Sequence, residues 1–138
     1  MGPRLGVDVA APGDLVWELL TDVSCWSRWG PTVGGARLDD RTSTLSAGAR
    51  GSVRTPVGAW LGFRVDRWQP DPPRRTWSWT VAGVPATEHT VLDRGPERCR
   101  VEMGVPWWAT PYLAVTGLAL VRIRRLAEGD RPDDRPDV

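Results

Sequence analysis

The sequence contains no lysine and no asparagine, and histidine, tyrosine, phenylalanine, isoleucine and glutamine each occur once. Without lysine the protein cannot form a Schiff base with a carbonyl substrate, and a single histidine excludes any site that needs two. The two cysteines, Cys25 and Cys99, lie far apart without CxxC spacing, which predicts reduced thiols. The GxSxG, HExxH, P-loop and GxGxxG motifs are also missing, so we expect no metal and no cofactor.

The charge balance excludes further classes of protein. All 18 basic residues are arginine and 17 residues are acidic, which leaves a net charge of +1 without a basic stripe and gives nucleic-acid binding little support. Nothing that resembles a signal peptide precedes residue 10, which together with reduced thiols predicts a cytoplasmic protein. The apolar run over residues 105–121 is broken by Pro106 and Pro111 and is shorter than the ~20 residues of a membrane span.

The length and the composition of the chain are typical of a single globular domain. The chain has 138 residues and a mass of 15.2 kDa, with 41% hydrophobic and 25% charged residues. Residues 130–138 have no apolar periodicity and predict a disordered acidic tail. We therefore expect one domain over residues 1–129 and no internal repeat.

Hydrophobic periodicity predicts the order of the elements. Residues 3–10 alternate in polarity like a half-buried strand, and two short helices follow, the second over residues 23–29 and stopped by Gly30-Pro31. A long helix is predicted from Pro111 to Glu128, with Tyr112 in its first turn on the side that faces the sheet. Between these helices, turn residues separate six extended runs, over residues 35–39, 50–56, 60–69, 75–82, 86–93 and 98–105.

Six strands with such short connections predict an antiparallel meander. One face of this sheet is apolar, with Phe63, Trp77, Trp79 and Met103 among its residues, and the opposite face is polar. The predicted fold class is α+β: a curved seven-stranded antiparallel sheet wrapped around a long C-terminal helix, with two short helices between strands 1 and 2. Such an arrangement leaves a space between the concave face and the helix.

Two regions of the sequence, each made of two short segments, carry a family resemblance. Residues 11–22, APGDLVWELLTD, and residues 26–31, WSRWGP, resemble the opening of the START-like (SRPBCC, Bet v 1-like helix-grip) superfamily, in its bacterial polyketide cyclase/dehydrase branch. Residues 65–70 and 74–79 are similar to the central hairpin of the same family. The resemblance spans about residues 3–128 and implies the helix-grip fold. It leaves the reaction open, because the superfamily contains cyclases, hydrolase-like enzymes, lipid carriers and ligand sensors.

His89 and Tyr112 are the candidate catalytic residues. His89 is the only side chain that titrates near neutral pH, but the two faces of its predicted strand have similar apolar content. The resemblance of His89-Thr90-Val91 to the family's His-x-large apolar pattern implies that His89 points into the cavity; the alternative is an exposed or structurally bonded histidine. The Tyr112 phenol is placed to hydrogen-bond an oxygenated ligand, and the alternative is an ordinary core residue.

Aromatic residues dominate the candidate binding site. Related proteins carry the short second helix at the cavity rim, so Trp26 and Trp29 belong there, and the tryptophans either line the cavity or fill it. Arg67 continues the apolar alternation of residues 61–65 and either polarises a ligand carbonyl or snorkels at the sheet edge. The complete set of candidate ligand-binding residues is Trp26, Trp29, Phe63, Arg67, Trp77, Trp79, His89, Met103, Tyr112 and Thr116.

The predicted function is the binding of a hydrophobic small molecule, aromatic or polyketide-like, in this cavity. The alternative is an aromatase-type polyketide cyclase or dehydratase that uses the same cavity, mainly through orientation. A third hypothesis is a protein-interaction module that uses Trp107-Trp108, which otherwise cap the entrance. The expected partner is a small molecule, with no nucleic acid and no membrane span, and the protein is a monomer or a homodimer.

Overall fold

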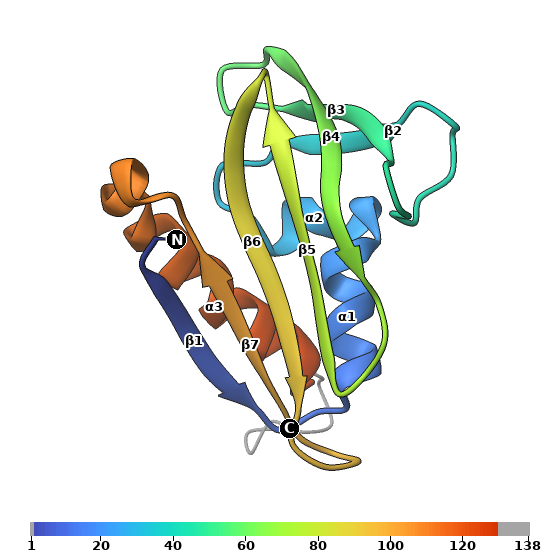
Figure 1. Ribbon diagram of the computed structural model, residues 1–138, viewed down its shortest axis with the longest axis vertical. Helices are drawn as coiled ribbons and strands as arrows, with labels where there is room; N and C mark the ends of the chain where they lie inside the picture. Colours follow the sequence, from blue (N-terminus) through green and yellow to red (C-terminus); the bar gives the residue numbers. More distant parts are fainter. Residues whose placement is uncertain (1, 130–138) are drawn as a thin grey trace, which may run out of the picture.

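The computed structural model describes residues 2–129, so the predicted tail over residues 130–138 lies outside the described part of the chain. One strand, two short helices, six further strands and the long C-terminal helix follow one another in the predicted order (Figure 1). The elements are β1 (Arg4–Val9), α1 (Gly13–Thr21), the 3-10 turn η1 (Val23–Cys25), α2 (Trp26–Trp29), β2 (Gly35–Leu38), β3 (Arg50–Arg54), β4 (Trp60–Gln69), β5 (Arg74–Val81), β6 (Val84–Asp93), β7 (Cys99–Gly104), the 3-10 segment η2 (Trp107–Tyr112) and α3 (Leu113–Ala127).

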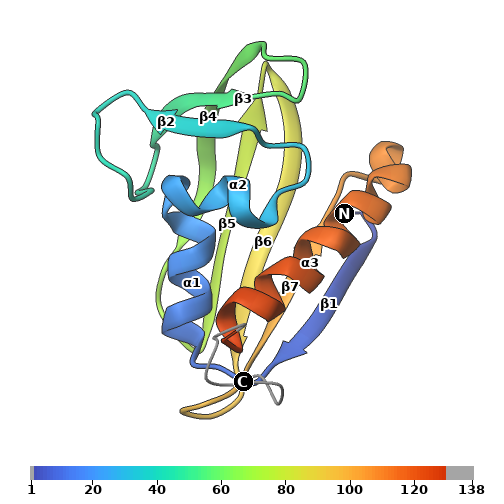
Figure 2. The ribbon, with the colours of Figure 1, turned by 180° about the vertical axis from the view of Figure 1, so that it is seen from behind.

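The seven strands form one antiparallel sheet in the order β1-β7-β6-β5-β4-β3-β2. Strands β2 to β7 follow one another as a meander, and β1 pairs with β7 at the edge. All the helices lie on one side of this curved sheet, with α3 crossing β1 and β7 and α1 and α2 covering the central strands (Figure 2). The predicted helix-grip architecture is therefore confirmed. Within the described residues, no helix is long and apolar enough to cross a membrane.

The hairpin between β5 and β6 is tighter than the sequence suggests. The segment from Gly83 to Pro85 reads as a turn, but the turn consists of Ala82 and Gly83 alone, with φ angles of 52° and 80°. Positive φ at both central residues is the geometry of a two-residue hairpin whose twist matches the strands. Strand β6 therefore begins at Val84 rather than at Ala86.

A β-bulge in β4 overturns the predicted orientation of Arg67. The register of β4 against β5 shifts between Val65 and Arg67, so the alternation of inward residues does not continue to Arg67. Arg67 lies on the outer face of the sheet, and Trp68 turns inward instead, with its ring centroid 5.4 Å from that of Trp17 in α1. A pattern of period two cannot reveal the extra residue of a bulge.

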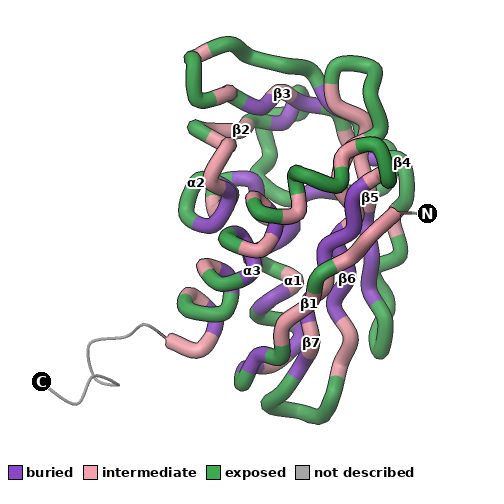
Figure 3. Tube along the Cα trace, turned by 90° about the vertical axis from the view of Figure 1, so that its left-hand side faces the viewer, coloured by how far each residue is buried: buried purple, intermediate pink, exposed green. Residues whose placement is uncertain are grey.

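The core lies between the sheet and the helices, where purple buried segments of strands and helices face one another in Figure 3. One end of this space is closed by an ion-pair cluster: Arg75, almost fully buried, contacts Asp14 of α1 at 2.6 Å and Asp93 of β6 at 3.6 Å. This cluster holds the start of α1 against the sheet. The opposite end, where β6 begins and η2 leads into α3, is open.

Candidate functional site

Two adjoining cavities occupy the open end of the domain. The outer cavity has a volume of about 340 Å³ and the inner one about 40 Å³. They meet at a neck, which we define as the residues that line both cavities: Thr32, Val33, Trp79, Thr87 and Tyr112. The outer volume is within the range of small-molecule sites, and the inner one has room for a single functional group or a water molecule.

The outer cavity has mainly apolar walls. They come from β3, the ends of the β4, β5 and β6 strands, the loop after α2, and η2. Among the described residues that line it, Arg54 is the only charged one. Because an uncompensated charge is costly to bury, these walls favour an uncharged ligand body. The apolar lining residues include Val33, Val53, Leu61, Trp79, Val81, Val84, Val105 and Trp108.

A hydroxyl pair lies at the neck between the two cavities. The Thr32 Oγ1 and Tyr112 OH atoms are 2.8 Å apart, and one of the two hydroxyls donates to the other. The second hydroxyl keeps its own proton available for a ligand oxygen. Tyr112 is the last residue of η2 and is 38% exposed, so it stands at the neck rather than in the first turn of a sheet-facing helix as the sequence suggests.

His89 faces the inner cavity and is held by a directional chain of hydrogen bonds. The Trp79 indole N–H, which can only donate, lies 3.0 Å from Thr87 Oγ1, and Thr87 Oγ1 lies 3.0 Å from His89 Nε2. The other ring nitrogen, Nδ1, is 3.4 Å from the Trp77 carbonyl oxygen, which can only accept. The consistent assignment places the imidazole proton on Nδ1, so that Nε2 accepts from Thr87.

The surroundings of His89 keep its imidazole neutral. The residue is 2% exposed, and its ring stacks on Trp77 with centroids 3.9 Å apart. Burial lowers the pKa of His89 from 6.5 to about 3, against a smaller opposing effect of the Trp77 carbonyl. A histidine of such low basicity is poorly matched to proton transfer near neutral pH. In this site its Nε2 serves as a hydrogen-bond acceptor.

Trp26, Trp29 and Trp77 are packed core residues that also line the inner cavity. The indole N–H groups of Trp26 and Trp29 donate to the main-chain carbonyls of Leu20 and Leu19, so these two residues fix the turn between the short helices. Trp77 is fully buried and stacks on Trp26 with an interplanar angle of 6°. Trp79 is the tryptophan that lines both cavities.

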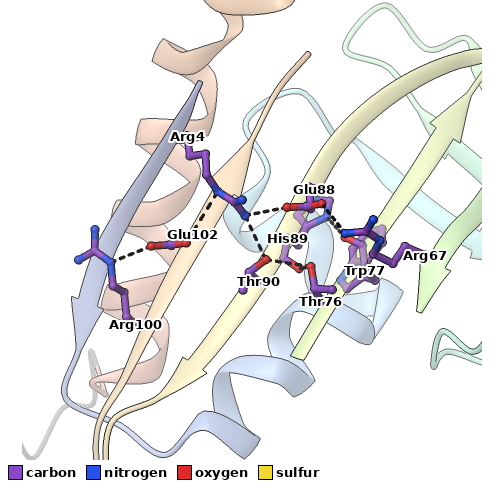
Figure 4. A network of polar contacts seen from close by, with 9 residues as sticks. All are labelled: Arg4, Arg67, Thr76, Trp77, Glu88, His89, Thr90, Arg100 and Glu102. Atoms are coloured by element: carbon purple, nitrogen blue, oxygen red, sulfur yellow. Dashed lines mark hydrogen bonds and ion pairs between the residues drawn. The ribbon is translucent and has the colours of Figure 1, made fainter. Parts of the chain in front are cut away.

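Of the four remaining candidate residues, two line the inner cavity and two line neither cavity. Met103 of β7 and Thr116 of α3 line the inner cavity. Phe63 packs behind Trp79, with ring centroids 5.3 Å apart, and lines neither of the two cavities. Arg67 is on the outer face, where its guanidinium is 3.5 Å from Glu88 (Figure 4), so the predicted contact of Arg67 with a ligand carbonyl is wrong.

The cysteines offer no nucleophile for this site. Cys99 is buried at the start of β7, and burial, assisted by the charge of Asp93, raises its pKa to about 11. The thiol therefore stays protonated and behaves as a small apolar side chain. Cys25 is partly buried in η1, and burial likewise raises its pKa.

Three residues of the neck are absent from the candidates that the sequence suggested. Thr87 lies two residues before His89 and therefore on the same face of the strand. This spacing in the sequence was sufficient to identify Thr87. Thr32 and Val33 lie in an irregular loop after α2 and carry no periodic signal. The hydrogen bond that brings Thr32 to Tyr112 joins positions 80 residues apart.

Comparisons with solved structures agree with the architecture. A hypothetical protein of Helicobacter pylori is 16% identical, with a TM-score of 0.71 over 90% of this chain and 86% of that one. The di-domain ARO/CYC protein BexL of the BE-7585A biosynthetic pathway is 15% identical, with a TM-score of 0.63 over 89% of this chain and 45% of that one. DynU16, a putative protein in the dynemicin biosynthetic locus, is 26% identical, with a TM-score of 0.59 over 94% of this chain and 48% of that one.

Sequence comparison establishes the family. Among curated proteins none matches significantly. Residues 5–130, however, match the family described as polyketide cyclase / dehydrase and lipid transport. This match covers nearly the whole chain and includes all four segments that carry the resemblance. With the helix-grip fold and the cavity at its open end, it shows that the chain belongs to the polyketide cyclase/dehydrase and lipid transport family.

Proposed function

We propose that the protein binds a planar hydrophobic small molecule, aromatic or polyketide-like, in the two adjoining cavities. The observation that carries this proposal is the outer cavity itself, which has about 340 Å³ of space within mainly apolar walls. Burying an apolar ligand there is favourable by roughly 25 cal/mol per Å² of surface removed from water. The flat faces of Trp79 and Trp108 in its walls suit a fused-ring molecule.

The polar groups at the neck define how such a ligand lies. Its apolar body fills the outer cavity, and one oxygen reaches the Thr32–Tyr112 pair, whose free hydroxyl proton donates to it. The inner cavity of about 40 Å³ admits only one further small group. A hydroxyl there is able to donate to His89 Nε2 in place of Thr87, because the neutral imidazole accepts at that atom. The expected ligand is therefore uncharged at its buried end.

The competing function is catalysis, as a cyclase or dehydratase of the same class of ligand. The family description supports this candidate, since it includes both enzymes and carriers. In such an enzyme the cavity would orient a reactive chain, and the Thr32–Tyr112 hydroxyls would polarise its carbonyls. The low pKa of His89 and the engagement of its Nε2 by Thr87 argue against His89 as the proton carrier.

Filling the outer cavity tests the proposal. A titration of the full chain with a tricyclic hydroxyanthraquinone, followed by calorimetry, should show saturable binding at one site. The Val81→Trp variant places an indole in the outer cavity and should weaken binding at least about tenfold, because the ligand and the new ring compete for the same volume.

The matched control is Val121→Trp, which makes the same change at a position of α3 that is 44% exposed and lines neither cavity. This variant should bind as the wild type does. Equal affinity of the two variants, or no saturable binding by the wild type, would show that the cavity is not the site. Conversion of an open-chain poly-β-ketone, seen either as an isomer of the same mass with a different retention time or as a product that has lost water, would identify turnover and favour the enzyme.

A further inference from the structure

The end of the molecule at which the outer cavity opens is almost free of charge. The walls of this cavity come from four segments, residues 32–33, 53–61, 79–87 and 105–112. Arg54 is their only charged residue, although Asp, Glu and Arg make up 25% of the chain. Charged side chains are otherwise the default covering of a protein surface, so this distribution marks one end as different from the rest.

Large apolar side chains are exposed at the same end. Val57 is 90% exposed, Trp107 73%, Trp108 53% and Val84 46%. They belong to three separate tips, namely the β3–β4 turn, the β5–β6 turn and η2, which all lie in the upper part of Figure 1. Exposed apolar groups gathered around one opening mark an interaction site. We call the following six residues the apolar rim: Val57, Leu61, Val84, Trp107, Trp108 and Tyr112.

The apolar rim has a sharp boundary. Immediately beyond it, on the outer face of the sheet, the side chains form a network of ion pairs (Figure 4). Arg4 contacts Glu88 at 2.7 Å and Glu102 at 3.8 Å, and Arg100 contacts Glu102 at 3.0 Å. Ordinary charged surface therefore begins at Glu88, the first charged residue of β6, directly after Thr87 at the neck.

We propose that the apolar rim is a membrane-contact surface that rests on the interfacial region of a lipid bilayer. Tryptophan is the side chain best suited to that region, because its ring is amphipathic and sits at the level of the headgroups. The three tips would enter to a depth of about 5–10 Å, as other interfacial apolar surfaces do. In this orientation the outer cavity opens toward the acyl chains.

The shape of the surface favours a bilayer over a protein partner or a second copy of this chain. A protein must match its partner's surface at close to interior packing density, and here the centre of the surface is a cavity of about 340 Å³. Fluid lipid adapts to three separate tips without leaving a void. A partner recognised by charge would also need several complementary charges, and these segments supply only Arg54.

Binding to vesicles tests this proposal without any cavity ligand. The full chain is mixed with extruded phosphatidylcholine vesicles, and the bound fraction is measured by flotation. We expect the wild type to float with the vesicles, equally in about 0.1 M and 0.5 M NaCl, because the surface carries almost no charge for salt to screen. The double variant Val57→Glu/Trp107→Glu should lower the partition coefficient at least about tenfold, because two carboxylates would enter the interface.

The matched control introduces the same charge at the other end. Leu15 is 39% exposed in the first turn of α1, beside the closed end at Asp93, and Leu15→Glu should float as the wild type does. Neither Val57 nor Trp107 lines the two cavities, so the double variant should bind the anthraquinone with unchanged affinity. Loss of vesicle binding is thereby separated from loss of the cavity function.

Three results would overturn the membrane proposal. The first is a wild type that does not float with phosphatidylcholine vesicles. The second is binding that requires anionic phosphatidylglycerol and disappears in 0.5 M NaCl, which would assign the contact to arginine side chains. The third is a wild-type dimer in analytical ultracentrifugation that the Val57→Glu/Trp107→Glu change converts to a monomer without affecting flotation, which would make the apolar rim a contact between copies.

Discussion

Lowering the pH from 7 to 5 is expected to destabilise the folded protein by about 2 kcal/mol through His89 alone. The pKa of His89 is lowered to about 3 in the folded state, compared with 6.5 for the free side chain. Between these two values the unfolded chain binds a proton that the folded protein does not. The stabilising contribution is therefore complete above pH 6.5 and is lost as the pH falls toward 3, at about 1.4 kcal/mol per pH unit.

The contribution of His89 to the pH dependence can be measured separately from other groups, because His89 is the only histidine in the chain. Carboxylates of ordinary pKa titrate mainly below pH 5, so the window from pH 7 to 5 reports on His89. Urea unfolding at several pH values should show the loss in the wild type and a nearly flat free energy of unfolding in His89→Gln. A flat profile in the wild type would mean that the folded protein accommodates the imidazolium, contrary to the hydrogen-bond chain through Thr87.

Replacement of Trp77 by alanine is expected to have the largest effect on stability, a loss of about 3–5 kcal/mol in the free energy of unfolding. Trp77 is fully buried, and its ring lies between that of Trp26, at 5.6 Å, and that of His89, at 3.9 Å. An alanine there leaves a cavity that the surrounding aromatic rings cannot fill without moving. Urea unfolding followed by far-ultraviolet circular dichroism measures the change.

Two further variants serve as comparisons for Trp77→Ala. Within residues 2–129 the Trp77 Nε1 atom has no hydrogen-bond partner, so Trp77→Phe removes volume without breaking a bond and should cost less than half as much as alanine. Trp107→Ala removes the same side chain from a position that is 73% exposed and should change stability by no more than about 0.5 kcal/mol. A loss below about 1.5 kcal/mol for Trp77→Ala would show that the stack is not the centre of the core.

The sequence was sufficient for the fold because its patterns are local. Alternation in the strands, the turn residues between them and the helical spacing after Pro111 all act over a few residues, and the resemblance of residues 11–31 set their global arrangement. The structure confirms the meander, the short helices and the C-terminal helix. Features that depend on one extra residue could not be predicted from these patterns, as the bulge at Val65–Arg67 shows.

The site was harder to predict than the fold because it joins distant segments. The family pattern at His89-Thr90-Val91 placed His89 on the inner face, where the structure has it. The neck, in contrast, depends on a hydrogen bond between a loop residue, Thr32, and the end of η2, Tyr112. No periodicity links these positions, and three-dimensional packing also decides that Trp79 lines both cavities whereas Trp77 lines only the inner one.

The most direct test of the proposed binding site is the position of a bound ligand. Intermolecular nuclear Overhauser effects between the tricyclic hydroxyanthraquinone and the full chain would locate it. We predict contacts from the ligand protons to the Trp79 indole, the Val81 methyl groups and the Tyr112 ring, which meet in the outer cavity. Contacts confined to Trp107 or to the outer face around Arg67 and Glu88, with none to Trp79, would contradict binding in the outer cavity.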